Sequence, residues 1–291
     1  MNPRMEDPRS KEPKPPFPPQ PQQPPGLESE MTPAPDYGEK SYVGHGRLGG
    51  RRAFVSGGDS GIGRAVALAF AREGAQVAIG YLPEEESDAQ ETVRAIQASG
   101  GKCLTLPGDI RDPATCHRII DRVVKEFGGI DILVNNAGMQ RTHASMLEIS
   151  PEELDQVFRT NIFAMFYLCQ AAIPYMKAGS SIVNTASIQA FKPSPSLLHY
   201  AATKGAIVNF TKGLSQELAE KGIRVNAVAP GPIWTPLIPS TMDHENFGKK
   251  APLKRPGQPV ELAPIYVLLA STESSYVTGM TYGVTGGELF T

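Results

Sequence analysis

The stretch Ser56-Gly57-Gly58-Asp59-Ser60-Gly61-Ile62-Gly63-Arg64 decides the fold of this chain. It lies between an apolar strand expected at 52–56 and a helix expected at 62–73, and its glycines are spaced as G-x-x-x-G-x-G. A pyrophosphate must come close to the backbone N–H groups at the N-terminus of a helix, where side chains would block it. Glycines alone are also typical of any tight turn, but their position inside the first strand–helix unit predicts a dinucleotide-binding turn.

Strands continue to alternate with helices along the rest of the chain. We expect strands at 52–56, 76–80, 102–106, 130–134, 181–185, 224–228 and 280–284, and helices at 62–73, 84–98, 113–127, 150–177, 198–220 and 259–270. This alternation predicts an α/β fold, a doubly wound parallel sheet of about seven strands with helices on both faces. Segment 234–257 breaks the alternation just after a strand end and is rich in proline and glycine, so we interpret it as a substrate lid.

The helix expected at 150–177 begins with a clear start signal. Ser150 can cap the helix, and Glu153 completes a capping box. The same helix carries more apolar surface than one sheet face needs, from residues such as Phe158 and Phe166. This pattern fits a helix that is buried both at the sheet and at a subunit interface.

Residues 1–40 differ in composition from the remainder of the chain. They are rich in proline, which removes backbone donors and fixes φ, so they cannot form a helix or a central strand. They also have too few apolar side chains to build a core. We therefore divide the chain into a proline-rich leader at 1–40, extended or disordered, and a single α/β domain at 41–291. An arm along a neighbouring subunit and a ligand for proline-recognition domains are the alternatives for the leader.

Composition argues against several classes of protein. The 291 residues carry a formal net charge of −2, without the basic bias of a nucleic-acid binder. Cys103, Cys116 and Cys169 lack the spacing of a disulfide framework or zinc site, and we expect no metal. No signal peptide is visible, and the longest apolar run, 162–169, is too short to span a bilayer. We expect a cytoplasmic protein with a small-molecule partner and neither a membrane nor a nucleic-acid partner.

A second set of motifs follows the glycine turn in a fixed order. It consists of Asn135-Asn136-Ala137-Gly138 after the fourth strand, Asn161, Ser187 after the fifth strand, a Tyr-x-x-x-Lys pair at Tyr200 and Lys204, and Pro230-Gly231 after the sixth strand. With these motifs, Gly50 to Thr291 resembles the short-chain dehydrogenase/reductase family, whose domain is of the Rossmann type. The leader, Tyr81-Leu82-Pro83 and segment 230–236 look more particularly like a bacterial branch similar to general-stress and glucose/ribitol-dehydrogenase-like proteins.

The chemistry of these residue types supports an oxidoreductase independently of the family. A tyrosine has a pKa near ~10 and is a poor base at neutral pH, but a nearby cation lowers its pKa by ~1–3 units. Tyr200 and Lys204 lie at positions i and i+4 of one helix, hence on one face. Ser187 can donate a hydrogen bond to the reacting oxygen. We therefore expect Tyr200 to be the catalytic acid/base, with Lys204 supplying the charge.

The resemblance implies further roles. Lys204 also grips the nicotinamide ribose, and Asn161, the fourth catalytic residue, helps to hold a water that relays protons. The implied cofactor-binding residues are Gly57, Asp59, Ser60, Gly61, Ile62, Gly63, Tyr81, Leu82, Asp109, Ile110, Asn135, Ala137, Gly138, Tyr200, Lys204, Pro230, Gly231, Ile233 and Thr235. The residues expected to face the substrate are Ser187, Gln189, Tyr200 and Trp234, with Gln140 and His143 near the pocket. His199 is interpreted as structural, and the family is usually a homotetramer or homodimer.

The choice between NAD and NADP depends on the end of the second strand. A Rossmann-type domain often has an acidic residue there for the adenosine ribose, but Tyr81 occupies that position. Arg64 could reach a 2′-phosphate, whereas glutamates 84–86 would repel it if they face the site. These glutamates also suit a solvated helix N-terminus. Taken together, these residues favour NAD slightly over NADP.

The expected activity is NAD(P)-dependent interconversion of a secondary alcohol, with a polyol or sugar as first candidate, and its ketone or aldehyde. A 3-oxoacyl thioester reductase is the alternative enzyme, because Lys249, Lys250, Lys254 and Arg255 could form a basic patch for an acyl carrier. A nicotinamide-sensing binding protein and an assembly protein that acts through its leader are alternatives of another class.

Overall fold

The central layer of the molecule is a parallel sheet. The computed structural model describes residues 6–289, and its seven strands lie in the order β3-β2-β1-β4-β5-β6-β7. The strands are β1 (Arg52–Ser56), β2 (Gln76–Tyr81), β3 (Cys103–Pro107), β4 (Ile132–Asn135), β5 (Ser181–Thr185), β6 (Arg224–Pro230) and β7 (Thr281–Val284). The strand order reverses between β1 and β4, and the carboxyl ends of these two strands form the crevice where such sheets bind ligands. The predicted fold is confirmed.

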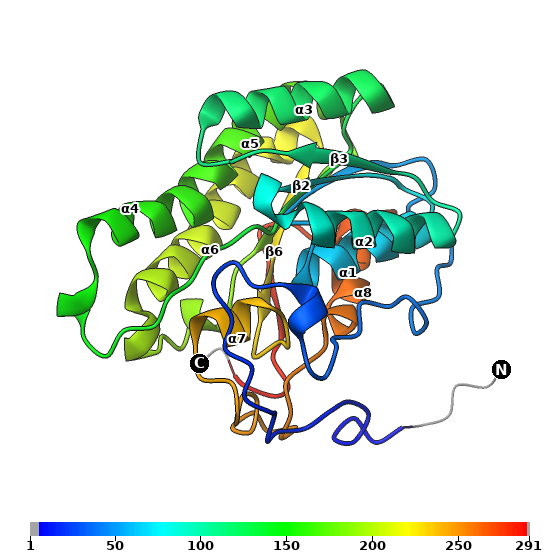
Figure 1. Cartoon of the computed structure of the whole chain (residues 1–291). Coiled ribbons are helices and arrows are strands. Elements are labelled where there is room, and N and C mark those ends of the chain that lie inside the picture. The colour runs from blue at the N-terminus through cyan, green and yellow to red at the C-terminus, as the bar shows by residue number, and fades with distance from the viewer. Residues whose placement is uncertain (1–5, 290–291) are drawn as a thin grey trace.

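Helices cover both faces of this sheet (Figure 1). They are α1 (Gly61–Arg72), α2 (Glu86–Ala98), α3 (Pro113–Phe127), α4 (Pro151–Phe158), α5 (Ala164–Ala172), α6 (Leu198–Leu218), α7 (Leu237–Thr241) and α8 (Ala263–Ala270). Helices α1, α2 and α8 share one core, and α3, α5 and α6 share the other. Side chains alternate along β1, so Val55 enters the first core and Phe54 the second.

The helix expected at 150–177 is not continuous. A π-helical turn at Arg159–Phe163 separates α4 from α5, and a 3-10 turn at Ile173–Tyr175 ends the segment. A π turn adds a residue to the helical repeat, and such turns are frequent at functional sites. Here the turn contains Asn161, whose side chain is buried.

The capping box expected at the start of α4 is half wrong. The Ser150 hydroxyl does accept the Glu153 N–H at 3.1 Å. The carboxylate of Glu153, however, does not return to Ser150; its Oε1 lies 2.6 Å from His143 Nε2.

The proline-rich leader lies against its own chain, over the lid (Figure 1). Phe17 stacks on Trp234 with ring centroids 4.2 Å apart. The indole Nε1 of Trp234 donates to the Pro33 carbonyl at 2.8 Å, and Trp234 is fully buried. The leader thus supplies apolar cover to the lid instead of forming a core of its own.

The outer face of α5 and its preceding turn exposes large apolar side chains. Phe163 and Phe166 are 38% and 42% exposed, and Phe166 packs against Phe210 of α6 at 4.4 Å. The homotetramer or homodimer expected from the sequence stays a prediction. Within residues 6–289, none of the helices is long and apolar enough to cross a membrane.

Replacing Phe17 with alanine should expose the lid tryptophan. Removing a buried phenylalanine ring costs about 3 kcal/mol, and water would then reach the indole. Since Trp234 is the single tryptophan of the chain, its fluorescence reports the change directly. We expect a red-shifted emission and stronger quenching by acrylamide. Val43→Ala, at a side chain just after the leader that is 68% exposed, is the control. An unchanged spectrum in Phe17→Ala would show that the leader does not cover the lid.

Candidate active site

The glycine turn allows α1 to approach the end of β1 closely. Gly57 and Gly61 have left-handed φ values of +62° and +52°, which glycine adopts at little cost. A Cβ at Gly63 would lie 1.8 Å from the Gly57 carbonyl oxygen. A side chain at Gly63 is therefore excluded, and helix α1 can begin close to the end of β1, where a pyrophosphate would approach its N-terminus.

A cavity of about 520 Å³ opens above this turn, at the carboxyl ends of the strands. Most of the predicted cofactor residues line it, namely Gly57, Asp59, Ser60, Gly61, Ile62, Tyr81, Leu82, Asp109, Ile110, Ala137, Gly138, Tyr200, Lys204, Pro230, Gly231, Ile233 and Thr235. Gly63 and Asn135 do not. Gly63 packs beneath the turn, and the Asn135 amide is turned inward, donating to Asn184 Oδ1 at 2.8 Å. The size and lining of the large cavity fit a dinucleotide.

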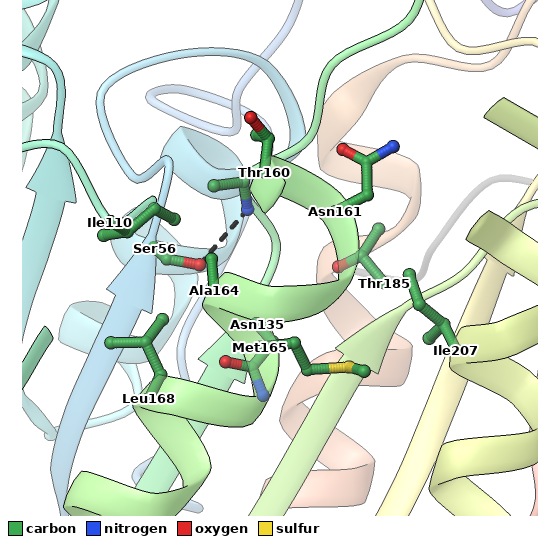
Figure 2. Close-up of a pocket in the computed structure, with 11 residues that line it drawn as sticks. Ser56, Ile110, Asn135, Thr160, Asn161, Ala164, Met165, Leu168, Thr185 and Ile207 are labelled. Carbon is green, nitrogen blue, oxygen red and sulfur yellow. Dashed lines mark hydrogen bonds between the residues drawn. The ribbon is translucent and has the colours of Figure 1, made fainter. Parts of the chain in front are cut away.

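A second, much smaller cavity of about 10 Å³ adjoins the large one and shares Ile110, Ala137 and Thr185 with its lining. Figure 2 shows its lining, with Asn161 at one end and Leu168 at the other, and with the Ser56 hydroxyl accepting the Ala137 N–H at 3.2 Å. Asn161 is clamped to Met139, since its Oδ1 accepts the Met139 N–H at 2.8 Å and its Nδ2 donates to the Met139 carbonyl at 2.9 Å. The structure thus gives Asn161 a role in fixing the backbone beside Gly138. Its part in a water relay stays a prediction.

The three residues expected at the chemical centre come together on the wall of the large cavity. Ser187 follows β5, and its hydroxyl lies close enough to Tyr200 to oppose the rise in the pKa of the phenol. Lys204, one turn along α6, lies with Nζ 5.3 Å from the centroid of the Tyr200 ring. Its ammonium donates to the Thr185 carbonyl at 2.8 Å, which fixes the side chain below the ring.

Burial dominates the electrostatics of this group. It raises the pKa of Tyr200 to about 12, with the Ser187 hydroxyl acting in the opposite direction. It also lowers the pKa of Lys204 to about 7. The expectation that Lys204 lowers the pKa of Tyr200 is therefore not met by the chain's own residues, because burial disfavours both charged forms. At neutral pH Tyr200 holds its proton and is ready to donate it.

Two residues expected to face the substrate lie elsewhere. Trp234 is turned away from the large cavity, because its ring needs the apolar cover of Phe17 and its Nε1 the acceptor of Pro33. His143 is held by Glu153. Gln140 and Gln189 do line the cavity. Sequence reasoning missed the apolar lid side chains Leu237, Ile238, Met242 and Phe247, which line it as well; their position within the expected lid was the available signal.

The adenosine end expected near Tyr81 is lined by acidic groups. Asp59 and Glu85 line the cavity there, and burial raises the pKa of both carboxyls. Arg64, which the sequence suggested could reach a 2′-phosphate, does not line the cavity. It pairs with Glu39 of the leader at 2.9 Å and lies over the ring of Tyr37, 4.5 Å from its centroid.

Asp109 and Arg111 also line this end of the cavity. They form an ion pair at 2.6 Å, and the guanidinium lowers the pKa of the Asp109 carboxyl. The cation of Arg111 is thus already neutralised by a neighbour on the same loop.

The leader reaches the glycine turn through Glu28. Its Oε1 accepts the Gly61 N–H at 2.6 Å, so this carboxyl caps the N-terminus of α1. Its burial raises the pKa of Glu28 to about 8. Sequence reasoning gave no sign of this contact, because nothing local connects a proline-rich segment with a turn so far along the chain.

A parallel sheet with a glycine turn at its switch point and a Ser–Tyr–Lys group above it defines a nicotinamide-dependent oxidoreductase. Comparison with known proteins narrows the class. Residues 57–288 match the family model described as enoyl-(acyl carrier protein) reductase. The chain belongs to the short-chain dehydrogenase/reductase family and is an NAD(P)-dependent enzyme of that family.

Several relatives are similar over most of their length. General stress protein 39 of Bacillus subtilis is 52% identical, covering 92% of this chain and 94% of its own. Glucose and ribitol dehydrogenase of Daucus carota is 48% identical, covering 91% and 94%. NADPH-dependent aldehyde reductase 1 of Arabidopsis thaliana is 49% identical, covering 91% and 95%. These names agree with the predicted branch.

Solved structures are similar in fold. A short-chain dehydrogenase from Burkholderia cenocepacia in complex with NADP has a TM-score of 0.78 and 34% identity, covering 83% of this chain and 98% of its own. A 3-ketoacyl-(acyl-carrier-protein) reductase from Brucella melitensis complexed with NADH has a TM-score of 0.77 and 33% identity, covering 82% and 98%.

Replacing Glu28 with glutamine should change how stability depends on pH. The folded pKa of about 8 lies above the ordinary 4.5, so between these values the folded protein holds a proton that the unfolded chain releases. Stability should therefore fall as pH rises through this window, by up to about 1.4 kcal/mol per pH unit. In Glu28→Gln this contribution disappears. Urea unfolding across the window measures the difference.

Glu30→Gln is the matched control, because Glu30 lies in the same turn and is exposed. It should keep the wild-type slope. A Glu28→Gln protein with the same slope as wild type would show that this carboxyl does not titrate between the folded and unfolded states in this range.

Proposed function

We propose that this enzyme interconverts a secondary alcohol, with polyols or sugars as the substrate class, and the corresponding ketone or aldehyde. The observation that carries the proposal is the convergence of Ser187, Tyr200 and Lys204 on the wall of the large cavity, with the Lys204 ammonium beside the Tyr200 ring. A nicotinamide cofactor, when bound, supplies the hydride acceptor or donor. The protein's task is then to hold the reacting oxygen and to move one proton.

Tyr200 and Ser187 divide this task. In carbonyl reduction the Tyr200 hydroxyl gives its proton to the substrate oxygen, and the raised pKa keeps that proton in place until it is needed. Ser187 donates a hydrogen bond to the same oxygen as charge develops on it. In alcohol oxidation Tyr200 must first lose its proton, and the charged form of Lys204 stabilises the resulting phenolate.

The lining of the large cavity supports a hydroxyl-bearing substrate. Gln140 and Gln189 present amide groups to it, and Gln140 is oriented by a hydrogen bond to Thr241 of 2.9 Å. The relative named glucose and ribitol dehydrogenase suggests the same class.

The 3-oxoacyl thioester reductase is the alternative enzyme. The matching family model and one of the similar solved structures are named as acyl-carrier-protein reductases. The basic patch considered for it is smaller than expected, because Arg255 is buried and paired with Glu261 at 2.7 Å. A binding or assembly protein would have no need for the Ser187–Tyr200 arrangement, which favours an enzyme.

We also propose a preference for NAD over NADP. The relatives' names include both cofactors, so the preference rests on this chain's own residues. Asp59 and Glu85 line the adenosine end, and the two arginines nearby are already paired, Arg64 with Glu39 and Arg111 with Asp109. A 2′-phosphate would meet carboxyl groups without a free cation to bind it.

Turnover of a substrate panel tests the activity. The panel contains polyols, sugars, an apolar ketone and a 3-oxoacyl thioester. We expect turnover of polyols or sugars, and a fall in kcat of about a hundred- to ten-thousandfold in Tyr200→Phe, with cofactor binding retained in calorimetry. Tyr276→Phe, at a fully exposed tyrosine, should keep wild-type activity. Turnover confined to the apolar ketone would refute the substrate class, and salt-sensitive turnover of the thioester would favour the alternative. An active Tyr200→Phe would refute the acid/base assignment.

Calorimetric titration with each cofactor tests the preference. We expect NADP(H) to bind at least about tenfold more weakly than NAD(H), because the 2′-phosphate would lose its hydration beside buried carboxyl groups and find no free cation in return. Glu85→Gln should narrow this ratio, whereas Glu84→Gln, at an exposed neighbour that lies outside the cavity lining, should leave it unchanged. Equal affinities in the wild type would contradict the preference.

A further inference from the structure

Three side chains that the reaction does not use meet beside the substrate end of the large cavity. His143 comes from the loop after β4, Glu153 from the first turn of α4, and His199 from the first turn of α6. His143 Nε2 and His199 Nε2 lie 2.6 Å and 3.0 Å from the same oxygen, Glu153 Oε1. We call these three residues the His–Glu–His cluster.

The cluster is not explained by hydrogen bonding alone. His199 is buried, with 2% of its side chain exposed, yet both of its ring nitrogens lack a hydrogen-bond partner of acceptable geometry. Buried polar atoms are nearly always satisfied, so an unsatisfied imidazole aimed at a carboxylate calls for a ligand. The Glu153 carboxylate does not complete the expected capping box; it lies between the two imidazole rings.

We propose that the His–Glu–His cluster is a binding site for a divalent cation of the zinc type. Two imidazole nitrogens and one carboxylate oxygen form a donor set that zinc uses in proteins, leaving a fourth position for water. Imidazole ligands also exclude magnesium and calcium, which prefer oxygen.

The distances are compatible with such a site. The three ligand atoms all lie within 4.8 Å of one another. A cation ~2.0–2.2 Å from each ligand in tetrahedral geometry holds the ligands about 3.3 Å apart. The two histidine–carboxylate distances of 2.6 Å and 3.0 Å therefore need to lengthen by less than about 1 Å.

The surroundings of the cluster also suit a metal. The carboxylate Oε2 of Glu148 lies 3.8 Å from His143 Nδ1, the position from which a second carboxylate orients a metal-bound histidine. Arg141 lies 4.0 Å from Glu153 and opposes the cation, but its side chain is 47% exposed and solvent screens it.

Cation binding would join three elements that surround the catalytic tyrosine. His199 directly precedes Tyr200 on α6, and the loop of His143 also carries Gln140 at the cavity wall. The site is therefore a positioning device, and its ligands touch neither the cofactor turn nor the reacting oxygen.

Metal titration of the full chain tests the proposal. After treatment with a chelator, the protein is titrated with Zn²⁺ by calorimetry, and with Co²⁺ by visible absorption. We expect one Zn²⁺ per chain, a rise in Tm, and the strong Co²⁺ bands of a four-coordinate site. His143→Gln and Glu153→Gln should each weaken Zn²⁺ binding by more than about tenfold.

His117→Gln, at an exposed histidine of α3, is the matched control and should bind Zn²⁺ like the wild type. Because His143 is in a partly exposed loop, its variant should fold, and its circular dichroism and cofactor binding report this independently. Failure of the wild type to bind Zn²⁺, or equal affinities in wild type and His143→Gln, would overturn the proposal. None of these readouts depends on the identity of the substrate.

Discussion

The close approach of α1 to the end of β1 is the constraint on which the site depends. Gly63 stands where any Cβ would meet the carbonyl of Gly57 at 1.8 Å, so helix and strand can pack at this distance only through glycine. The amide of Asn136 completes the join, since its Nδ2 donates to the Gly57 carbonyl at 3.0 Å. This places the ends of β1 and β4, and with them the floor of the large cavity, in a single rigid unit.

The catalytic group is built on the same sheet but in a different electrostatic setting. Lys204 is tied to the carbonyl of Thr185, at the end of β5, and the Thr185 hydroxyl is tied to Tyr266 at 2.7 Å. Fixed dipoles replace water around the ammonium and the phenol, which is how a buried site can hold charge without reorganising. The shifts of both pKa values in the direction of the neutral forms follow from that lack of water.

The sequence was sufficient for the fold and for the residues whose roles depend on local spacing. Alternating strands and helices predict the sheet, and the i, i+4 spacing of Tyr200 and Lys204 predicts their shared face. Residues whose partners lie far away in the chain were misjudged. Trp234 is buried by Phe17, and Arg64 is engaged by Glu39.

The same limit applies to the helix expected at 150–177 and to the His–Glu–His cluster. The π turn around Asn161 has no signature that hydrophobic periodicity can show, because it shifts the repeat by a single residue. His143, Glu153 and His199 have no metal-ligand spacing in the sequence, since three separate elements bring them together. Contacts of this kind are set by tertiary packing, which short-range patterns do not encode.

The leader also has a consequence for how the protein is made. Chains emerge from the ribosome with the N-terminus first, so Phe17 and Pro33 exist long before the surface that receives them. Pro33 is separated from Trp234 by 201 residues, and Phe17 donates its N–H to the carbonyl of Glu245. During synthesis Phe17 and Pro33 must wait until residues 234–245 have been released, whereas Glu28 can meet Gly61 much earlier. The docking of this part of the leader over Trp234 is therefore a late event of biogenesis.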